Sequence, residues 1–266
     1  MLRTVATFFC PILLGACASA PGAPHAAIAD LAPTGKLRAV INLGNPILAT
    51  KDDTTGEPRG VSVDLARELA KRLGVDVELV TVNSAGEAVD KLASGRVDVG
   101  FFAIDPARAT TTAYTAPYVQ IEGSYLVRND SRIRTNDDVD REGVRVAVGN
   151  KSAYDLFLTR ELESATIERA PTSPLVVDFF LARGLDTAAG VRQQLQADAK
   201  RVGNVRVLPG RFMVIDQAMG MAKNKEAAAN YLIAFVEEMK ASGWVADALA
   251  RHRINDVSVA PPGAGS

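Results

Sequence analysis

The sequence predicts an α/β fold. Helical and strand-like patterns alternate along the 266 residues, which is typical of this fold class. Several helical stretches end at a glycine that is followed by an apolar strand pattern. One such joint occurs twice, because residues 89–98 and 177–186 each place two aspartates eight positions apart around a glycine. The repeat indicates two similar parts.

The first part is read in order from residue 36. The range 36–43 is apolar and bounded by glycines, so it predicts a strand. In 61–73, leucines recur on one helical face, and Gly74 follows as a C-terminal cap. The next predicted elements are a strand at 75–79, a helix from the capping box of Ser84 and Glu87 to residue 94, and a strand at 97–101.

A turn follows the strand at 97–101. Asp105 and Pro106 have the residue types of a helix N-cap and first helical position. Arg108 is therefore expected in the first turn of a helix that begins where a strand ends. Ligands of open α/β sheets bind at this edge.

The second part repeats the alternation. Ser152 is expected to cap a helix, with Asp155 three residues on. The remaining predicted elements are strands at 144–148, 167–170, 185–190 and 205–208, helices at 173–184, 191–200, 225–241 and 244–251, and a crossing segment at 213–222.

Composition excludes several function classes. The chain is 47% hydrophobic and 23% charged, with a net charge of -1, so no basic surface for nucleic acid or an anionic membrane is expected. Neither of the two histidines lies near another metal-ligand residue in the sequence. We expect no cofactor, no metal and a monomer.

The N-terminus reads as a secretion signal over residues 1–17. Arg3 precedes an apolar stretch at 5–14 that is too short to span a bilayer. Leu14-Gly15-Ala16-Cys17 resembles a bacterial lipoprotein box, in which Cys17 would be lipidated. The alternative is ordinary cleavage near residue 20, although Pro21 disfavours it. Residues 18–33 are rich in Ala and Pro and are predicted to be a flexible tether.

An ordered set of motifs carries a family resemblance. Residues 60–74 read G-x-x-x-D-L-A-x-x-L-A-x-x-L-G, residues 92–98 read L-x-S-G-x-V-D, and 115–118 read T-x-P-Y, with the Arg108 turn between the last two. This order resembles the family 3 extracellular solute-binding proteins, the amino-acid-type receptors of ABC importers. The resemblance covers about residues 35–250.

The resemblance implies a two-lobed type II periplasmic binding protein. Each lobe would be a mixed sheet flanked by helices, and the ligand would lie in the cleft between them. Lobe 1 is expected to comprise 34–124 and 219–256, and lobe 2 to comprise 125–218, followed by a disordered tail at 257–266.

The candidate site residues of lobe 1 lie at or just after the ends of its predicted strands. The family uses the arginine at Arg108 to hold the ligand's carboxylate, and the alternative is a salt bridge to Asp105 or Glu122. Asp105 could touch the ligand, but capping of the turn is favoured. Ala103 lies where relatives often place a hydroxyl, and Asn45 is either a ligand contact or a turn former.

Candidate site residues of lobe 2 lie at strand-to-helix junctions. Ser152 and Thr172 could present hydroxyls and helix amides to a carboxylate. The aspartate that binds the ligand's ammonium in the family is replaced here by Val191, followed by Arg192, which could hold a second anionic group. These departures predict a ligand without an obligatory α-ammonium.

The sequence therefore predicts a periplasmic receptor, either free or lipid-anchored. It would bind a small carboxylate, an amino acid or a related organic acid, and deliver it to an ABC permease of the inner membrane. It is not expected to be an enzyme. Two alternatives stay open: an enzyme that resembles cyclohexadienyl dehydratases, and an orphan sensory or scavenging lipoprotein.

Overall fold

The structure, a computed structural model, describes residues 22–263. Its α-helices are α1 (His25–Leu31), α2 (Val61–Leu73), α3 (Ala85–Ala93), α4 (Ala153–Glu161), α5 (Val176–Ala182), α6 (Arg192–Val202), α7 (Glu226–Ala241) and α8 (Trp244–Arg251). Short 3-10 turns are η1 (Arg108–Thr110), η2 (Asn136–Asp138) and η3 (Ser173–Leu175). Its strands are β1 (Lys36–Asn42), β2 (Thr50–Lys51), β3 (Pro58–Arg59), β4 (Asp76–Val82), β5 (Val99–Ala103), β6 (Thr112–Arg128), β7 (Arg145–Gly149), β8 (Thr166–Ala170), β9 (Thr187–Val191), β10 (Val205–Val207), β11 (Met213–Ala222) and β12 (Ser258–Val259).

One mixed sheet runs through the described part of the chain. Its strand order is β4-β1-β5-β11-β6-β9-β7-β8, with β10 and β12 also paired to β6. The outer strands pair in parallel, whereas β11 and β6 are antiparallel to their neighbours. The mixed α/β fold is therefore confirmed.

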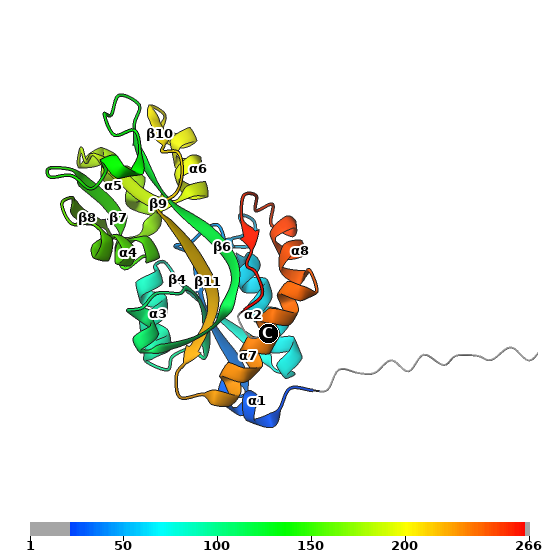
Figure 1. The fold of residues 1–266 in the computed structure, drawn as a ribbon. Helices are drawn as coiled ribbons and strands as arrows, with labels where there is room; N and C mark the ends of the chain where they lie inside the picture. The colour runs from blue at the N-terminus through cyan, green and yellow to red at the C-terminus, as the bar shows by residue number, and fades with distance from the viewer. Residues whose placement is uncertain (1–21, 264–266) are drawn as a thin grey trace, which may run out of the picture.

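The sheet divides into two halves. We call the part with β4, β1, β5, α2, α3, α7 and α8 the first half, and the part with β9, β7, β8, α4, α5 and α6 the second half. Figure 1 shows that the long strands β6 and β11 run from one half into the other. Their pairing is irregular at two places, between Gln217 and Ala218 and between Ala218 and Gly220. The predicted lobe boundaries at 124/125 and 218/219 fall inside these two strands, and the division stays a prediction.

Each half has its own apolar core. In the first half, Leu65 and Leu69 of α2 are fully buried in a cluster that also contains Phe235 of α7. The leucine period in the sequence places these side chains on the face that meets the sheet. In the second half, buried clusters on the two faces of the sheet are built around Tyr154 and Phe180. Separate cores allow each half to move as a body.

Two glycines shape the ends of α2. Gly74 has φ +70° and its amide donates to the carbonyls of Ala70 and Lys71, so it ends the helix as predicted. Gly60 has φ +128°, and a Cβ there would lie 2.3 Å from the carbonyl oxygen of Leu48. Only glycine allows the loop after β1 to approach the start of α2 this closely.

The predicted tether at 18–33 is wrong for part of its described residues. His25–Leu31 form α1, in which Ala27 and Leu31 are at most 1% exposed. The carbonyl of Asp30 accepts a hydrogen bond from Lys225 Nζ at 2.6 Å, at the start of α7. An Ala-rich stretch without clear periodicity becomes helical here because its apolar side chains bury against α7.

The predicted disordered tail at 257–266 is also wrong where it is described. Ser258 and Val259 pair with β6, and the amide of Ala260 donates to the carbonyl of Tyr118 at 3.1 Å. Hydrogen bonds to the backbone of β6 thus order residues 258–260, although their sequence has no clear strand pattern.

The helix predicted after Asp105 is wrong as well. Only η1 forms, because the chain enters β6 at Thr112.

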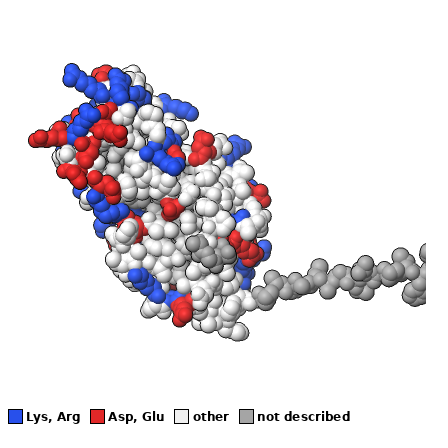
Figure 2. All heavy atoms as spheres, in the orientation of Figure 1, with Lys and Arg blue, Asp and Glu red and all other residues white. Residues whose placement is uncertain are grey.

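Figure 2 shows acidic and basic side chains intermixed over the second half, whereas the face of the first half in this view carries few of either. Between residues 22 and 263, no helix combines the length and apolarity that a membrane crossing requires.

Candidate functional site

A cavity of about 50 Å³ lies between the two halves. It is formed by the carboxyl ends of β1 and β5, the N-terminal ends of several helices, and β11. Its polar lining comprises Asn42, Asn45, Ser62, Arg108, Ser152, Tyr154, Ser173, Gln194 and Gln217. The apolar side chains that line it are those of Leu48, Ala85, Phe101, Phe102, Ala103, Ala153, Val191 and Ile215. The position matches the sheet edge that the sequence predicts.

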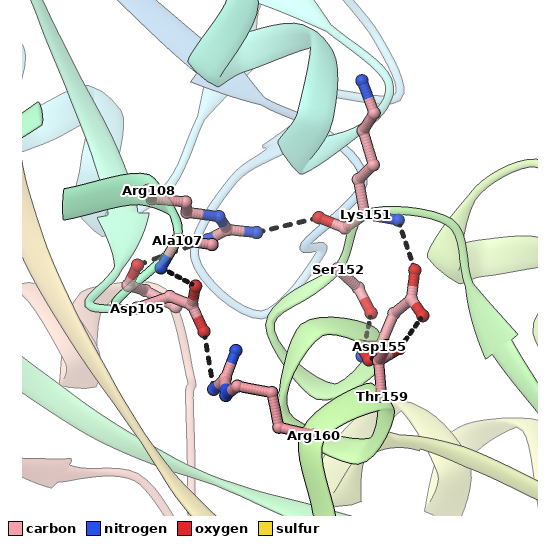
Figure 3. A network of polar contacts seen from close by, with 9 residues as sticks. Asp105, Ala107, Arg108, Lys151, Ser152, Asp155, Thr159 and Arg160 are labelled. Carbon is pink, nitrogen blue, oxygen red and sulfur yellow. Dashed lines mark hydrogen bonds and ion pairs between the residues drawn. The ribbon is translucent and has the colours of Figure 1, made fainter. Parts of the chain in front are cut away.

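Arg108 is the charged group of this cavity. It is only 6% exposed, and its Nη1 donates to the carbonyl of Ala103 at 3.3 Å. Its Nη2 donates to the carbonyl of Lys151 in the second half at 2.9 Å (Figure 3). Among residues 22–263, no carboxylate forms an ion pair with it, so the predicted alternative of a salt bridge to Asp105 or Glu122 does not occur.

Burial dominates the electrostatics of Arg108. Loss of solvent lowers the pKa of its guanidinium, and the nearby Tyr114 and Asp105 oppose that shift only in part. A guanidinium stays charged in proteins. A buried cation without an anionic partner is costly, so this site favours an anion from outside the chain.

Asp105 lies beside the cavity without lining it. Its Oδ1 accepts a hydrogen bond from the amide of Ala107 at 2.9 Å, so it stabilises the turn, as the capping interpretation predicts. Its Oδ2 lies 2.9 Å from Nη2 of Arg160 in α4 (Figure 3). The carboxylate is engaged on both oxygens and joins the two halves. The expectation that it touches the ligand is not supported.

Ser152 lines the cavity at the start of α4. Its Oγ accepts a hydrogen bond from the amide of Asp155 at 3.0 Å, which is the predicted cap. The same hydroxyl is also hydrogen-bonded to the phenol of Tyr154. Next to it, burial raises the pKa of Tyr154 to about 12, so this phenol stays protonated at neutral pH.

Four helices begin at the cavity. Its walls include Ser62 near the start of α2, Ala85 of α3, Ala153 of α4 and the N-cap Val191 of α6. Each helix N-terminus carries partial positive charge and unpaired amides. Together with Arg108, they make the cavity electropositive.

One wall of the cavity is apolar. Val191, Ala103 and Ile215 belong to a buried cluster shared by the two halves. Val191 is 7% exposed and stands at the N-cap of α6, where its apolar side chain cannot cap the helix. Val191 therefore lines the cavity with an apolar side chain.

The structure brings together four of the predicted ligand residues: Arg108, Ala103, Asn45 and Ser152. Thr172 lies outside the lining, and its neighbour Ser173 occupies the wall in its place. Arg192 is also outside, because its Nε donates to Glu122 at 2.7 Å and its Nη2 to the carbonyl of Gly210. The predicted second anion contact at Arg192 is thus not supported. Cys17 lies outside the described residues.

Several polar lining residues were not predicted from the sequence, and three of them come from other elements than the predicted residues. Gln217 comes from the returning strand β11, Gln194 from the first turn of α6, and Ser62 from the start of α2. The position of Ser62 after Gly60 at a helix start could have indicated it. Gln217 carries no local signal, because only the pairing of β11 with β5 brings it to the cavity.

The sequence of the chain matches a known protein family and several curated proteins. The model of the bacterial extracellular solute-binding proteins, family 3, matches residues 37–253. Among curated proteins, the virulence sensor protein BvgS of Bordetella pertussis is 29% identical over 161 residues, 60% of this chain. The matched region is only 12% of that relative.

Solved structures share the fold. The solute receptor for L-cysteine of Neisseria gonorrhoeae has a TM-score of 0.73 at 22% identity, over 85% of this chain and 92% of that one. The ancestral amino acid-binding protein AncCDT-1, a precursor of cyclohexadienyl dehydratase, has a TM-score of 0.70 at 21% identity, over 84% and 97%. At this identity, the likeness shows the fold alone.

Proposed function

Because the chain belongs to the family 3 bacterial extracellular solute-binding proteins, we propose that it is an extracytoplasmic receptor. It holds a small carboxylate-bearing solute between its two halves and delivers the solute to an ABC permease. One observation carries this proposal: the buried guanidinium of Arg108 has no carboxylate partner among the described residues and lines a cavity between the halves.

The geometry of Arg108 supports carboxylate binding. A guanidinium has five N–H donors, and the two contacts to carbonyl oxygens leave donors free. Paired N–H donors match the two oxygens of a carboxylate, and such charge-assisted bonds are the strong ones. The amides at the start of α4 add donors from the opposite side.

Closure of the halves would complete the site. Arg108 follows β5 in the first half, and its partner Lys151 precedes α4 in the second half. Separation of the halves would break this contact and open the cavity to solvent. Binding proteins of this shape close around their ligand by such a hinge motion, and the closed form is the one that would dock on a permease.

A sensory role is the second candidate. The match to the sensor BvgS favours it, since that relative carries a region similar to this chain. In that role the closed form would signal to a partner protein instead of a permease. Gene neighbours that encode a permease and an ATPase would favour the transport role.

An enzymatic role has less support. Catalysis on this fold needs a general acid or base in the cavity. Among the described residues, the lining contains no Asp, Glu or His. We therefore assign no reaction to the site, and turnover of prephenate or arogenate would reverse this assignment.

The test of carboxylate binding is the substitution Arg108→Ala. Purified protein is first screened by thermal shift against amino acids, 2-oxo acids, 2-hydroxy acids and dicarboxylates. Calorimetry with each acid that binds is then repeated on the variant, which should lose about 2–5 kcal/mol of binding free energy.

The matched control is Arg201→Ala, which removes an arginine paired at the surface with Asp178 and Asp198. The affinity of the Arg201→Ala protein for each acid should equal that of the parent protein. Equal affinity of Arg108→Ala and the parent, or no binding of any carboxylate to the parent, would refute the proposed function.

A further inference from the structure

The walls of the cavity carry positive charge without any acid. Arg108 is the one charged side chain among the described lining residues. Four acids near the cavity pair with cations elsewhere: Asp105 with Arg160, Asp155 with Arg169, Asp90 with Lys151, and Glu122 with Arg192 and Arg211. Asp216 stands between two lining residues, but it accepts a hydrogen bond from Gln120 and is not part of the lining. No described lining residue therefore offers a carboxylate to a cationic group of the solute.

The helix termini add to this imbalance. The N-terminal ends of α2, α3, α4 and α6 all meet at the cavity. Their partial positive charges stabilise anions and repel cations. An ammonium group inside the closed cavity would face these termini as well as Arg108.

On the side of Val191, the wall of the cavity is apolar and offers an ammonium group no side-chain acceptor. An ammonium has three N–H donors that each need an acceptor. Val191, Ala103 and Ile215 offer no side-chain acceptor along their wall. Burial of unpaired donors is costly, and the cost is larger for a charged group.

Two side-chain amides indicate what replaces the ammonium. Gln217 is 6% exposed, lines the cavity and makes no side-chain hydrogen bond among the described residues. Oδ1 of Asn45 is buried in the same lining and also has no partner. The free Oδ1 of Asn45 can accept from a hydroxyl, and the neutral carboxamide of Gln217 can either donate to an oxo oxygen or accept from a hydroxyl. The unpaired amides therefore match a neutral polar substituent of the solute.

The size of the cavity limits the solute further. At roughly 10–15 Å³ for each water-sized group, a cavity of about 50 Å³ holds only a few such groups. Short acids fit, and long side chains do not.

From these observations, and on the basis of the proposed function, we propose that the solute is a short monocarboxylate without an ammonium group. It carries a neutral oxo or hydroxyl substituent beside the carboxylate, as 2-oxo and 2-hydroxy acids do. Arg108 binds the carboxylate, Asn45 and Gln217 contact the neutral substituent, and Val191 excludes the ammonium of the corresponding amino acid.

The test uses acids that differ only at the second carbon. Calorimetry compares lactate and pyruvate with alanine, glycolate and glyoxylate with glycine, and the hydroxy and oxo acids of four carbons with 2-aminobutyrate. In at least one set, an ammonium-free acid should bind at least about 100-fold more tightly than the amino acid.

The outcomes separate the two proposals. Tighter binding of the amino acid in every set that binds overturns this inference, and loss of that binding in Arg108→Ala leaves the proposed function intact. Absence of binding by every acid of these sets overturns this inference alone if another carboxylate of the wider screen binds, and absence of binding by every carboxylate of that screen overturns the proposed function as well.

A substitution at Val191 provides an independent test. Val191→Asp restores a carboxylate to the wall, so it should weaken binding of the ammonium-free acid at least about 10-fold and strengthen binding of its amino acid. Val191→Asn is the matched control of the same size without charge, and it should not strengthen amino acid binding. Circular dichroism checks that both variants fold, and the comparison of acids on the parent protein stands without them. Unchanged preference in a folded Val191→Asp protein would overturn the role of Val191.

Discussion

The ion pair between Asp105 and Arg160 should control how readily the two halves close. Asp105 follows β5 in the first half and Arg160 lies in α4 of the second half, with 2.9 Å between Oδ2 and Nη2. Neither side chain lines the cavity. Arg160→Ala should therefore weaken ligand binding without removing any contact to the ligand.

The size of the effect follows from the burial of the pair. The side chain of Asp105 is 4% exposed and that of Arg160 is 40% exposed. A hydrogen bond to a charged group contributes about 1.5–3 kcal/mol when buried, whereas an exposed pair contributes about 0–1 kcal/mol because water screens it. A half-exposed pair should contribute about 1–2 kcal/mol to closure. Since the observed affinity scales with the closed population, affinity should fall roughly 5- to 30-fold.

The assay is calorimetry on the parent, Arg160→Ala and the control Arg183→Ala, combined with small-angle scattering. Arg183 pairs with Glu168 within the second half, so its loss should leave affinity unchanged. The ligand-free Arg160→Ala protein should have a larger radius of gyration than the parent. Equal affinities and equal radii for all three proteins would show that closure does not depend on this pair.

Three further predictions concern stability and anchoring. Gly60→Ala should destabilise the protein by about 1–3 kcal/mol, because φ is +128° and the added Cβ meets the carbonyl of Leu48 at 2.3 Å; an unchanged melting temperature would contradict this. The pKa of Asp140 is held below its usual range, because its carboxylate accepts hydrogen bonds from the amides of residues 163–165. A carboxyl with a lowered folded-state pKa stabilises the fold above its unfolded-state pKa, and this contribution is lost as pH falls through the folded-state value. Urea denaturation should therefore show Asp140→Asn less stable than the parent at pH 7, with the difference shrinking as pH falls below about 4; a constant difference would refute this. Cys17→Ser should abolish incorporation of a radiolabelled fatty acid and Cys10→Ser should not, and an unlabelled parent protein would rule out the lipoprotein box.

The helix ends that depend only on neighbouring residues could be predicted from the sequence. The side chains of Ser84 and Ser152 cap α3 and α4 through the amides of Glu87 and Asp155, as their spacing indicates. Gly74 ends α2 for the same kind of reason. These features depend on a few neighbouring residues, so one sequence is enough to find them.

Features that depend on distant partners were missed or misplaced. The helix α1 forms against α7, and β12 pairs with β6, although neither segment has a strong pattern of its own. Arg192 was predicted to meet the ligand, but Glu122, 70 positions earlier in the chain, holds it. The motifs around Arg108 pointed to a residue that does line the cavity. Gln217 could not be predicted, because only the pairing of β11 with β5 brings it there.

The irregular pairing of β11 with β6 starts at Gln217, the same residue whose amide faces the cavity. At such a bulge the ladder is locally disrupted and the strand is bent. A solute that contacts Gln217 would thus contact the connecting strand at its irregular point. Occupancy should be readable from the backbone, as slower amide hydrogen exchange at residues 217–220 when the solute is bound. On the proposed function, the strand that connects the two halves is then also a strand that contacts the solute.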